Sequence, residues 1–288
     1  MNVSRLNAGA VLADLSYSSF GGLDESAFLM SDIHWDAVEC DHDMLERHCE
    51  EAAERDAGIF IFGDLFDAMQ GPKDPRAAKS ALRASLEGKD AYFDEVVEQC
   101  AAWFGPYIPY LKVVGHGNHE TVHIKHHGIS LIDRFVDKVN MAGGDALSMG
   151  YEGWVLFRFE RVSGDSTGDR FTQKLYFNHG SGGTSAVTKG VTKVVRRAAY
   201  LPDADIVCSG HIHESWQMDI PRMRVTNQGR WFEDEQLHLQ LAAYLNGRDP
   251  SGMSWPASME FSPKPKGAWR LDFSTRNGAP VRQATRLR

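Results

Sequence analysis

Short apolar runs alternate with longer amphipathic stretches along much of the chain. The apolar runs predict strands at residues 27–31, 58–62, 110–114 and 206–209. The amphipathic stretches predict helices at residues 43–57, 90–104, 129–140 and 187–200. A short apolar run bounded by polar turns is typical of a strand that is covered on both faces. Alternating strands and helices of this kind indicate an α/β fold.

The second half of the chain is richer in strand signals. Residues 154–177 alternate between apolar and polar positions around a polar loop, which predicts a β-hairpin. Residues 223–226 and 268–273 are further predicted strands, whereas helix and strand signals compete over 233–245. We therefore expect a four-layer α/β-β-α sandwich of two mixed sheets, with functional groups at the carboxyl ends of the strands.

The length of 288 residues suits a single domain with a substantial core. We expect the core to span about 25–247, with a polar, basic insertion at about 70–89 and a C-terminal segment at about 248–288 that wraps the surface. No apolar stretch has the length of a signal peptide or a membrane span. A cytoplasmic protein with no membrane partner is the default expectation, and the oligomeric state stays open, a homodimer included.

The composition and the net charge exclude few classes of protein. Hydrophobic residues make up 42% of the chain and charged residues 24%, as in ordinary globular proteins. Four cysteines do not make a disulfide framework in a chain of this length, so we expect free thiols. The net charge of −8 argues against a nucleic-acid partner. Bound divalent cations would cancel part of that charge locally, so the charge does not decide the substrate.

Five short motifs carry side chains that bind metals, and four of them directly follow an apolar run. They are Asp32-Ile33-His34, Gly63-Asp64, Gly117-Asn118-His119-Glu120, Asn178-His179-Gly180 and Gly210-His211-Ile212-His213. Since ligands gather at the carboxyl ends of strands in open α/β sheets, we expect the five motifs to meet in one site. Each motif alone is also found in solvated loops and turns, and only their combination points to a metal site.

The donor types in these motifs favour a transition metal. The candidate metal ligands are Asp32, His34, Asp64, Asn118, His179, His211 and His213. Carboxylate, amide and imidazole donors together suit Mn²⁺, Fe²⁺ or Zn²⁺ better than the all-oxygen shells of Ca²⁺ and Mg²⁺. We expect two divalent metal ions. Mn²⁺ is the favoured metal, and Fe²⁺, Zn²⁺, Ni²⁺ or Mg²⁺ are the alternatives.

Two such cations about 3.5–4 Å apart can hold a bridging hydroxide and clamp phosphoryl oxygens during in-line displacement. Asp64, with two carboxylate oxygens, is the natural bridge between them. His119 is expected to be a general acid for the leaving group rather than a ligand, oriented by its acidic neighbour Glu120. The catalytic candidates are therefore His119, Asp64 and Glu120.

These residues, in this order, resemble the calcineurin-like metallophosphoesterase superfamily. The resemblance covers 32–213 and implies the α/β-β-α sandwich. It implies a first metal held by Asp32, His34, Asp64 and His213. It implies a second metal held by Asp64, Asn118, His179 and His211, with His119 contacting phosphate.

Differences from the signature residues of particular branches narrow down which part of the superfamily the chain resembles. Purple acid phosphatases have a tyrosine ligand where this chain has Asp67, and the lipid A pyrophosphatase branch has arginine in place of His119. The run Gly-Asp-Leu-Phe-Asp at 63–67 resembles the double-strand-break repair nucleases, but their long capping regions are not found here. The chain is broadly similar to stand-alone phosphoesterases carried by phages.

Several residues near the expected site, most of them basic, are relevant to the choice of substrate. The candidates for substrate contact are His123, Ser181, Lys189, Lys193 and Arg76. Contact with the phosphates of a nucleotide or nucleic acid is one interpretation, and a solvated helix face is the other. The expected activity is a phosphodiesterase or nuclease. A phosphomonoesterase is the alternative, and a non-catalytic scaffold of the same fold ranks below both.

Overall fold

The computed structural model describes residues 1–18, 22–69, 83–86, 91–163, 166–183, 185, 187–247, 262–276 and 279–288. Their strands form two sheets. The strands of the six-stranded sheet are β3 (Asp24–Met30), β4 (Gly58–Phe62), β5 (Leu111–Gly115), β6 (Leu147–Met149), β12 (Trp269–Arg276) and β13 (Ala279–Arg286). The strands of the seven-stranded sheet are β1 (Asn2–Asn7), β2 (Ala10–Ser18), β7 (Glu152–Ser163), β8 (Ser166–Asn178), β9 (Ile206–Ser209), β10 (Trp216–Val225) and β11 (Trp231–Gln240).

Both sheets are mixed. The strand orders are β13-β12-β3-β4-β5-β6 and β1-β2-β7-β8-β9-β11-β10. In the first sheet β3, β4, β5 and β6 are parallel neighbours, and in the second sheet β8, β9 and β11 are parallel neighbours. Parallel strands end at the same edge of a sheet, so each sheet presents several carboxyl ends together.

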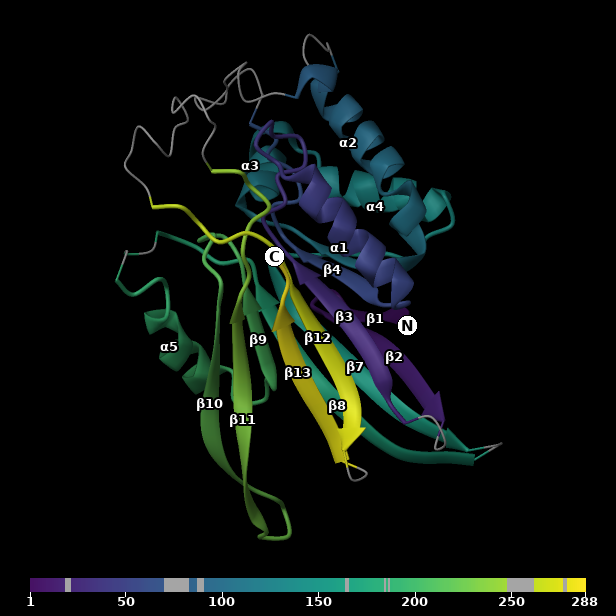
Figure 1. The fold of residues 1–288 in the computed structure, drawn as a ribbon, viewed down its shortest axis with the longest axis vertical. Helices are drawn as coiled ribbons and strands as arrows, with labels where there is room; N and C mark the ends of the chain where they lie inside the picture. The colour runs from purple at the N-terminus through teal and green to yellow at the C-terminus, as the bar shows by residue number, and fades with distance from the viewer. Residues whose placement is uncertain are drawn as a thin grey trace.

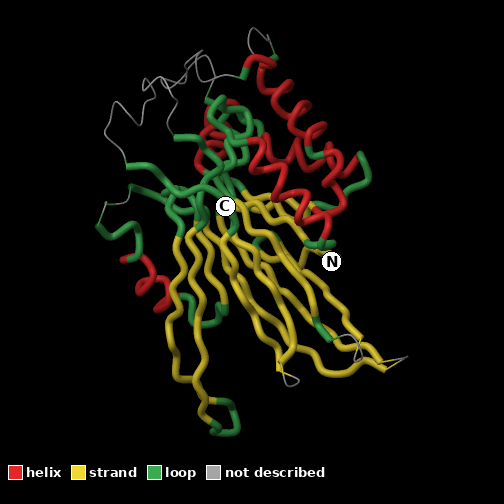
Figure 2. Tube along the Cα trace, viewed as in Figure 1, coloured by secondary structure: helices red, strands yellow, loops and turns green. Residues whose placement is uncertain are grey.

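Helices cover the outer faces of this sandwich (Figure 1). The helices are α1 (His42–Glu54), α2 (Tyr92–Trp103), α3 (Asn118–His127), α4 (Leu131–Met141) and α5 (Thr192–Tyr200), with short 3₁₀ turns at Ala84–Leu86 and Gly105–Tyr110. Figure 2 shows the strands together in one half of the molecule, with loops between their upper ends and most of the helices. The predicted four-layer α/β-β-α sandwich is confirmed.

The pattern of burial explains why β4 reads as a continuous apolar run. Ile59 and Ile61 pack in the cluster between the six-stranded sheet and its helices. Phe60 and Phe62 pack in the second cluster, between the two sheets. Side chains alternate across a strand, so a strand that is covered on both faces needs apolar residues at every position.

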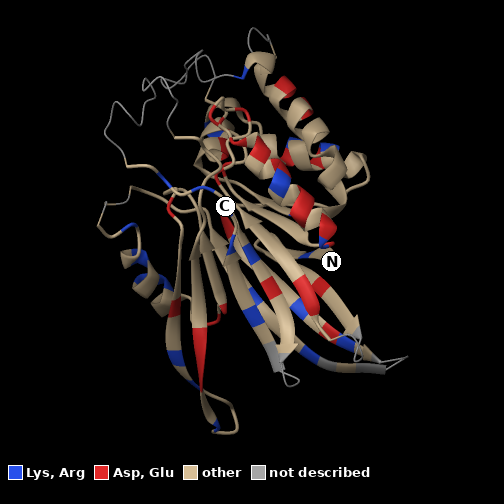
Figure 3. Ribbon diagram, viewed as in Figure 1, with Lys and Arg blue, Asp and Glu red and all other residues tan. Residues whose placement is uncertain are grey.

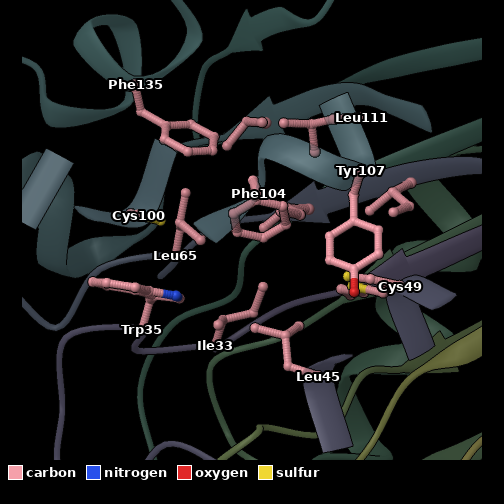
Figure 4. Packing of buried hydrophobic residues seen from close by; sticks show 14 of the residues in the cluster. Ile33, Trp35, Leu45, Cys49, Leu65, Cys100, Phe104, Tyr107, Leu111 and Phe135 are labelled. Atoms are coloured by element: carbon pink, nitrogen blue, oxygen red, sulfur yellow. The ribbon is translucent and has the colours of Figure 1, made fainter. Parts of the chain in front are cut away.

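Helices α1 and α4 begin at side-chain caps and bury one face each. Asp41 accepts a hydrogen bond from the Met44 N–H at 3.1 Å, and Ser130 accepts one from the Asp133 N–H at 3.0 Å. Such caps stabilise a helix by about 0.5–2 kcal/mol. The buried residues of α4 follow helical spacing and are Leu131, Ile132, Phe135, Val136 and Val139. Figure 4 shows Phe135 beside Phe104 in this helical layer of the core.

The predicted core boundaries are wrong at both ends. Strands β1 and β2 precede residue 25 and belong to the seven-stranded sheet. The described part of the C-terminal segment does not wrap the surface, because β12 pairs with β3 and β13 extends the same sheet. Leu271 and Phe273 place β12 in the core between the sheets. Only residues 83–86 of the basic insertion at 70–89 are described.

Other predicted elements differ in detail. Residues 231–240 form a strand, β11, because Leu237 and Leu239 face the core between the sheets, whereas Gln236 and His238 are buried on the other face. The predicted helix at 187–200 begins only at Thr192. Before it, Lys189 and Gly190 have positive φ angles of 45° and 81°, which interrupt a helix.

All four cysteines are free and buried, as expected. Among the described helices, none has the length and apolar character needed to cross a bilayer.

Candidate metal centre

All five motifs follow strands whose carboxyl ends lie at one end of the sandwich. Asp32 and His34 follow β3, Asp64 follows β4, and Asn118 lies just after β5. In the other sheet, His179 follows β8, and the two histidines of the fifth motif, His211 and His213, follow β9. Backbone hydrogen bonds hold these loops together. The Asp32 N–H donates to the Gly63 carbonyl at 3.0 Å, and the Gly210 N–H donates to the His179 carbonyl at 2.8 Å.

The first donor group consists of Asp32, His34 and His213. Their donor atoms all lie within 4.8 Å of one another. His213 Nε2 lies 3.3 Å from Asp32 Oδ1. Asp32 and His34 are buried, and the His213 side chain is 28% exposed. The group is therefore accessible on the side of His213.

The second donor group consists of Asp64, His179 and His211, with Asn118 beside them. The donor atoms of the first three again lie within 4.8 Å of one another. His179 Nε2 lies 3.1 Å from Asp64 Oδ2 and 3.1 Å from Asn118 Oδ1. His211 Nδ1 lies 2.6 Å from the same Asn118 oxygen. Carboxylate, amide and imidazole donors thus converge on a second point.

The two groups adjoin each other. His179 Nε2 of the second group lies 3.9 Å from Asp32 Oδ1 of the first. The Asp32 carboxylate also accepts the His211 N–H, at 3.0 and 2.9 Å to its two oxygens. Seven side chains that the sequence predicts as ligands are therefore brought together in one place.

Hydrogen bonds at the far nitrogens orient two imidazoles toward the centre. His179 Nδ1 lies 3.0 Å from the Phe62 carbonyl, and His34 Nδ1 lies 3.0 Å from Asp67 Oδ1. An imidazole that donates from Nδ1 presents the lone pair of Nε2, which is the arrangement that metal-binding histidines use. His34 Nε2 is buried and has no hydrogen-bond partner among the described residues. An unpartnered buried nitrogen beside carboxylate donors fits a metal site.

The backbone at these residues is strained. Asp32, His34, Asp64, His211 and His213 have positive φ angles of 52°, 49°, 49°, 71° and 52°. A non-glycine residue in this region costs about 1–3 kcal/mol, and such residues cluster where function imposes the conformation. The fold therefore holds these candidate ligands in place at a cost in stability.

Two motif glycines allow the loops to approach one another closely. A Cβ added at Gly117 would lie 2.1 Å from Asp64 Oδ1, and one at Gly63 would lie 2.4 Å from the His179 Nδ1. Gly63 also has a φ of +95°. Any side chain at either position would displace a donor of the second group.

Charges within the centre stabilise one another. Burial favours the neutral carboxyl, but His179 and His213 outweigh burial and lower the pKa of Asp32. Burial likewise opposes a charged His179, yet Asp32 and Asp64 raise its pKa to about 9. Protons thus balance the buried acids when no cation is bound. A divalent cation can replace these protons, as happens when metals bind.

His119 lies beside the two groups. The backbone N–H of His119 donates to Asp64 Oδ1 at 3.0 Å, and its imidazole Nε2 lies 3.9 Å from Asp64 Oδ2. Its Nδ1 lies 2.6 Å from the Asp67 carbonyl and 3.6 Å from Asp67 Oδ1. Nδ1 is thereby held by Asp67, and Nε2 is the nitrogen on the side of Asp64.

The predicted role of Glu120 is wrong. Its buried carboxyl group accepts hydrogen bonds from the N–H groups of Gly117, Phe66 and Asp64 at 2.8, 2.9 and 3.2 Å. Those bonds tie the second motif to the start of α3 and leave no described contact with the His119 side chain. Glu120 therefore supports the loop that carries Asp64, and Asp67 orients His119.

Glu120→Gln should lower stability, because its amide nitrogen would face backbone N–H donors. Losing acceptors for buried donors costs about 1–3 kcal/mol each, so we expect a lower urea midpoint by equilibrium unfolding. Glu98→Gln, on an exposed part of α2, is the matched control and should unfold like the parent. Unchanged stability in Glu120→Gln would contradict this structural role.

Asp67 and Asp36 are functional neighbours that the sequence did not reveal. Asp67 contacts His34 and His119, and these three form a further cluster of possible donors. Because Asp67 Oδ1 is engaged by His34 Nδ1, we assign Asp67 a positioning role. Asp36 in turn accepts the N–H groups of Asp67 and Ala68 at 2.6 and 2.9 Å and the Tyr92 hydroxyl.

The residues predicted to contact substrate lie in different surroundings. His123 is buried in α3, where its Nδ1 lies 2.9 Å from the Ile129 carbonyl oxygen and its ring centroid lies 4.3 Å from that of Phe93. Lys193 donates to the Ser181 carbonyl, so these two residues hold each other. Lys189 is exposed and lies near the fifth motif. Arg76 lies outside the described residues.

No protein-family model and no curated protein matches the chain. Solved structures match at low identity. Vacuolar protein sorting 29 from Cryptosporidium parvum is 11% identical, and the match covers 92% of this chain and 98% of that chain with a TM-score of 0.38. A predicted phosphoesterase from Streptococcus pneumoniae is 12% identical, with 91% and 98% covered and a TM-score of 0.31. Vps29 from Entamoeba histolytica, in complex with zinc, is 9% identical, with 91% and 98% covered and a TM-score of 0.34.

Structural similarities this distant do not decide function. The fold is therefore described from the topology of the chain itself. Two mixed sheets pack face to face, helices cover them, and the five motifs lie at the carboxyl ends of strands from both sheets. The chain therefore has the α/β-β-α sandwich of two mixed sheets that its sequence led us to expect, with the motif loops at one end.

Proposed function

We propose that this chain is a dinuclear metal-dependent phosphoesterase. One observation carries the proposal: donors from five loops and both sheets converge into two adjoining groups, and Asp32 of the first group lies 3.9 Å from His179 of the second. The first metal would be held by Asp32, His34, Asp64 and His213, as the family resemblance implies. The second would be held by Asp64, Asn118, His179 and His211.

Two divalent cations bound by these residues would supply an activated water and a positive clamp for phosphoryl oxygens. The chain's own groups set the geometry. The bonds of His34 to Asp67 and of His179 to the Phe62 carbonyl fix which imidazole nitrogen faces the centre. Substrate would enter on the side of His213, where the centre is open to solvent.

His119 is the proton donor in this proposal. With Nδ1 held by the Asp67 carbonyl, Nε2 is the atom that can pass a proton to a leaving oxygen beside Asp64. Burial and the neighbouring His34 lower the pKa of His119, which makes the protonated imidazole a stronger acid and reduces the fraction that is protonated at neutral pH. A general acid placed in this way contributes about 10²–10⁴-fold to the rate.

A phosphodiesterase acting on nucleotides or nucleic acid is the activity we favour. The loop after β8 brings Lys189 next to Glu214, the residue that follows the fifth motif. Figure 3 shows Lys and Arg along α5, whereas α1 and α2 carry mainly acids. Cationic side chains beside a phosphoryl-binding centre favour substrates with further phosphates.

Removal of metal tests the proposal. Exhaustive chelation should abolish hydrolysis of bis(p-nitrophenyl) phosphate, and added Mn²⁺ should restore it. Hydrolysis that survives chelation would refute a metal-dependent mechanism. Activity on oligonucleotides, cyclic nucleotides and nucleoside monophosphates, measured side by side, separates a diesterase from a monoesterase. A protein that binds metal but hydrolyses none of these substrates would instead be a scaffold.

A further inference from the structure

Three segments that are far apart in the sequence meet at Glu214. This residue follows His213 of the first donor group, and its side chain is 7% exposed. Lys264 Nζ donates to Glu214 Oε1 at 2.5 Å, and Lys189 Nζ lies 4.0 Å from Glu214 Oε2. In Figure 1 the loop after β8 and the segment that leads to β12 both lie at the end of the sheets where the motif loops are.

One carboxylate between two ammonium groups leaves a local net positive charge. The Lys189 side chain is 59% exposed and that of Lys264 is 33% exposed, so both can reach a bound anion. By contrast, Lys193 is engaged with the Ser181 carbonyl, and Lys266 donates to Asp41 and Asn246. Lys189 and Lys264 are thus the accessible cations beside the fifth motif among these four lysines.

The backbone of Lys189 is also fixed. It has a φ of 45°, and its carbonyl accepts a hydrogen bond from the Trp216 indole N–H at 2.8 Å. Holding a lysine in a left-handed conformation has a cost in stability. Its position next to Glu214, the residue that follows the fifth motif, is therefore determined by the fold.

We propose that Lys189 and Lys264 bind the phosphate that neighbours the scissile phosphodiester in a nucleic-acid strand, and that Glu214 positions both lysines. The inference rests on the proposed function and assigns its substrate class. Lysines bind phosphates as point charges without reading the base, so the subsite selects a strand of any sequence. Glu214 prevents the two ammonium groups from separating when no strand is bound.

The test compares two diesters that differ in the neighbouring phosphate. Thymidylyl-thymidine has one phosphodiester, whereas an oligothymidylate of ten residues has phosphates on both sides of most bonds. In the double variant Lys189→Ala/Lys264→Ala we expect kcat/KM on the oligothymidylate to fall by at least about 10-fold. On thymidylyl-thymidine and on bis(p-nitrophenyl) phosphate it should stay within about twofold of the parent.

Salt dependence gives a second readout. The slope of log(kcat/KM) against log[salt] on the oligothymidylate should become shallower by about 0.7 in the double variant, since both lysines contact one phosphate and each phosphate contact on a single strand contributes about 0.7. Arg55→Ala/Lys138→Ala removes the same charge just after α1 and on α4, where each residue pairs with a glutamate, and should keep the parent slope.

The outcomes separate this inference from the proposed function. If the parent hydrolyses neither diester with Mn²⁺, the proposed function fails. If the parent hydrolyses both, and the double variant loses activity equally on both or on neither, the subsite is refuted. If Glu214→Gln retains full preference for the longer strand, the positioning role of Glu214 is refuted. The lysine contacts are then judged from the double variant alone.

Discussion

Asp64→Asn should abolish phosphodiester hydrolysis and strip the protein of metal. Asp64 belongs to the second donor group, and the family resemblance gives it a share of both ions. An amide offers one neutral oxygen in place of a charged carboxylate. Because even the outer hydrogen-bond partners of metal ligands cost about 10–100-fold in affinity when removed, we expect Mn²⁺ binding at least about 100-fold weaker and kcat at least about 10³-fold lower.

Titration calorimetry with Mn²⁺ and initial rates on bis(p-nitrophenyl) phosphate measure the two effects. Asp137→Asn is the matched control, since Asp137 is exposed on α4. It should bind metal and turn over like the parent. Asp64→Asn that keeps the parent affinity for Mn²⁺ would show that Asp64 is not a ligand.

His119→Ala should lose turnover while keeping its metal. Its Nε2 lies 3.9 Å from Asp64 Oδ2, whereas its Nδ1 is held by the Asp67 carbonyl, so it stands beside the donor groups rather than within either proposed ligand set. Without a general acid, we expect kcat on an alkyl phosphodiester such as thymidylyl-thymidine to fall by about 10²–10⁴-fold. A nitrophenolate leaves without a proton, so bis(p-nitrophenyl) phosphate should be affected far less.

The difference between the two leaving groups distinguishes an acid from a ligand. His126→Ala, on an exposed turn of the same helix, should behave like the parent on both substrates. Loss of metal from His119→Ala, or an equal loss of rate on both substrates, would contradict the role of general acid.

The convergence of the candidate ligands was predictable because each of them lies in a short motif next to a strand. The apolar run of β4 predicts a strand that is buried on both faces, and Asp64 follows it directly. The same holds for β9 and the histidines after it. Parallel strands that end at one edge bring such residues together without any further information.

Residues that act through tertiary contacts were not predictable. Glu120 is next to His119 in sequence, yet its carboxyl group turns to the backbone of the second motif, and Asp67 takes the role expected of it. Lys264 reaches Glu214 across 50 positions of sequence. The spacing of Asp64 and Asp67 was visible, but nothing local shows that Asp67 contacts two imidazoles.

Strand predictions failed where the burial pattern is mixed. Most of β1 is exposed at a sheet edge, so it has no apolar run. In β11, buried glutamines and a histidine alternate with leucines, which hides the strand. A strand was predicted at 268–273, but it follows a polar stretch rich in proline and glycine, and only the pairing of β12 with β3 and of β13 with β12 reveals that the two strands complete the sheet.

The number of metal ions bound per chain tests the central claim most directly. Equilibrium dialysis of the metal-free protein against Mn²⁺, followed by elemental analysis and electron paramagnetic resonance, reports both the number of ions and their proximity. We expect two ions per chain with the spectrum of an exchange-coupled pair. A single isolated ion, or none, at saturating Mn²⁺ would contradict a two-metal centre built by these five loops.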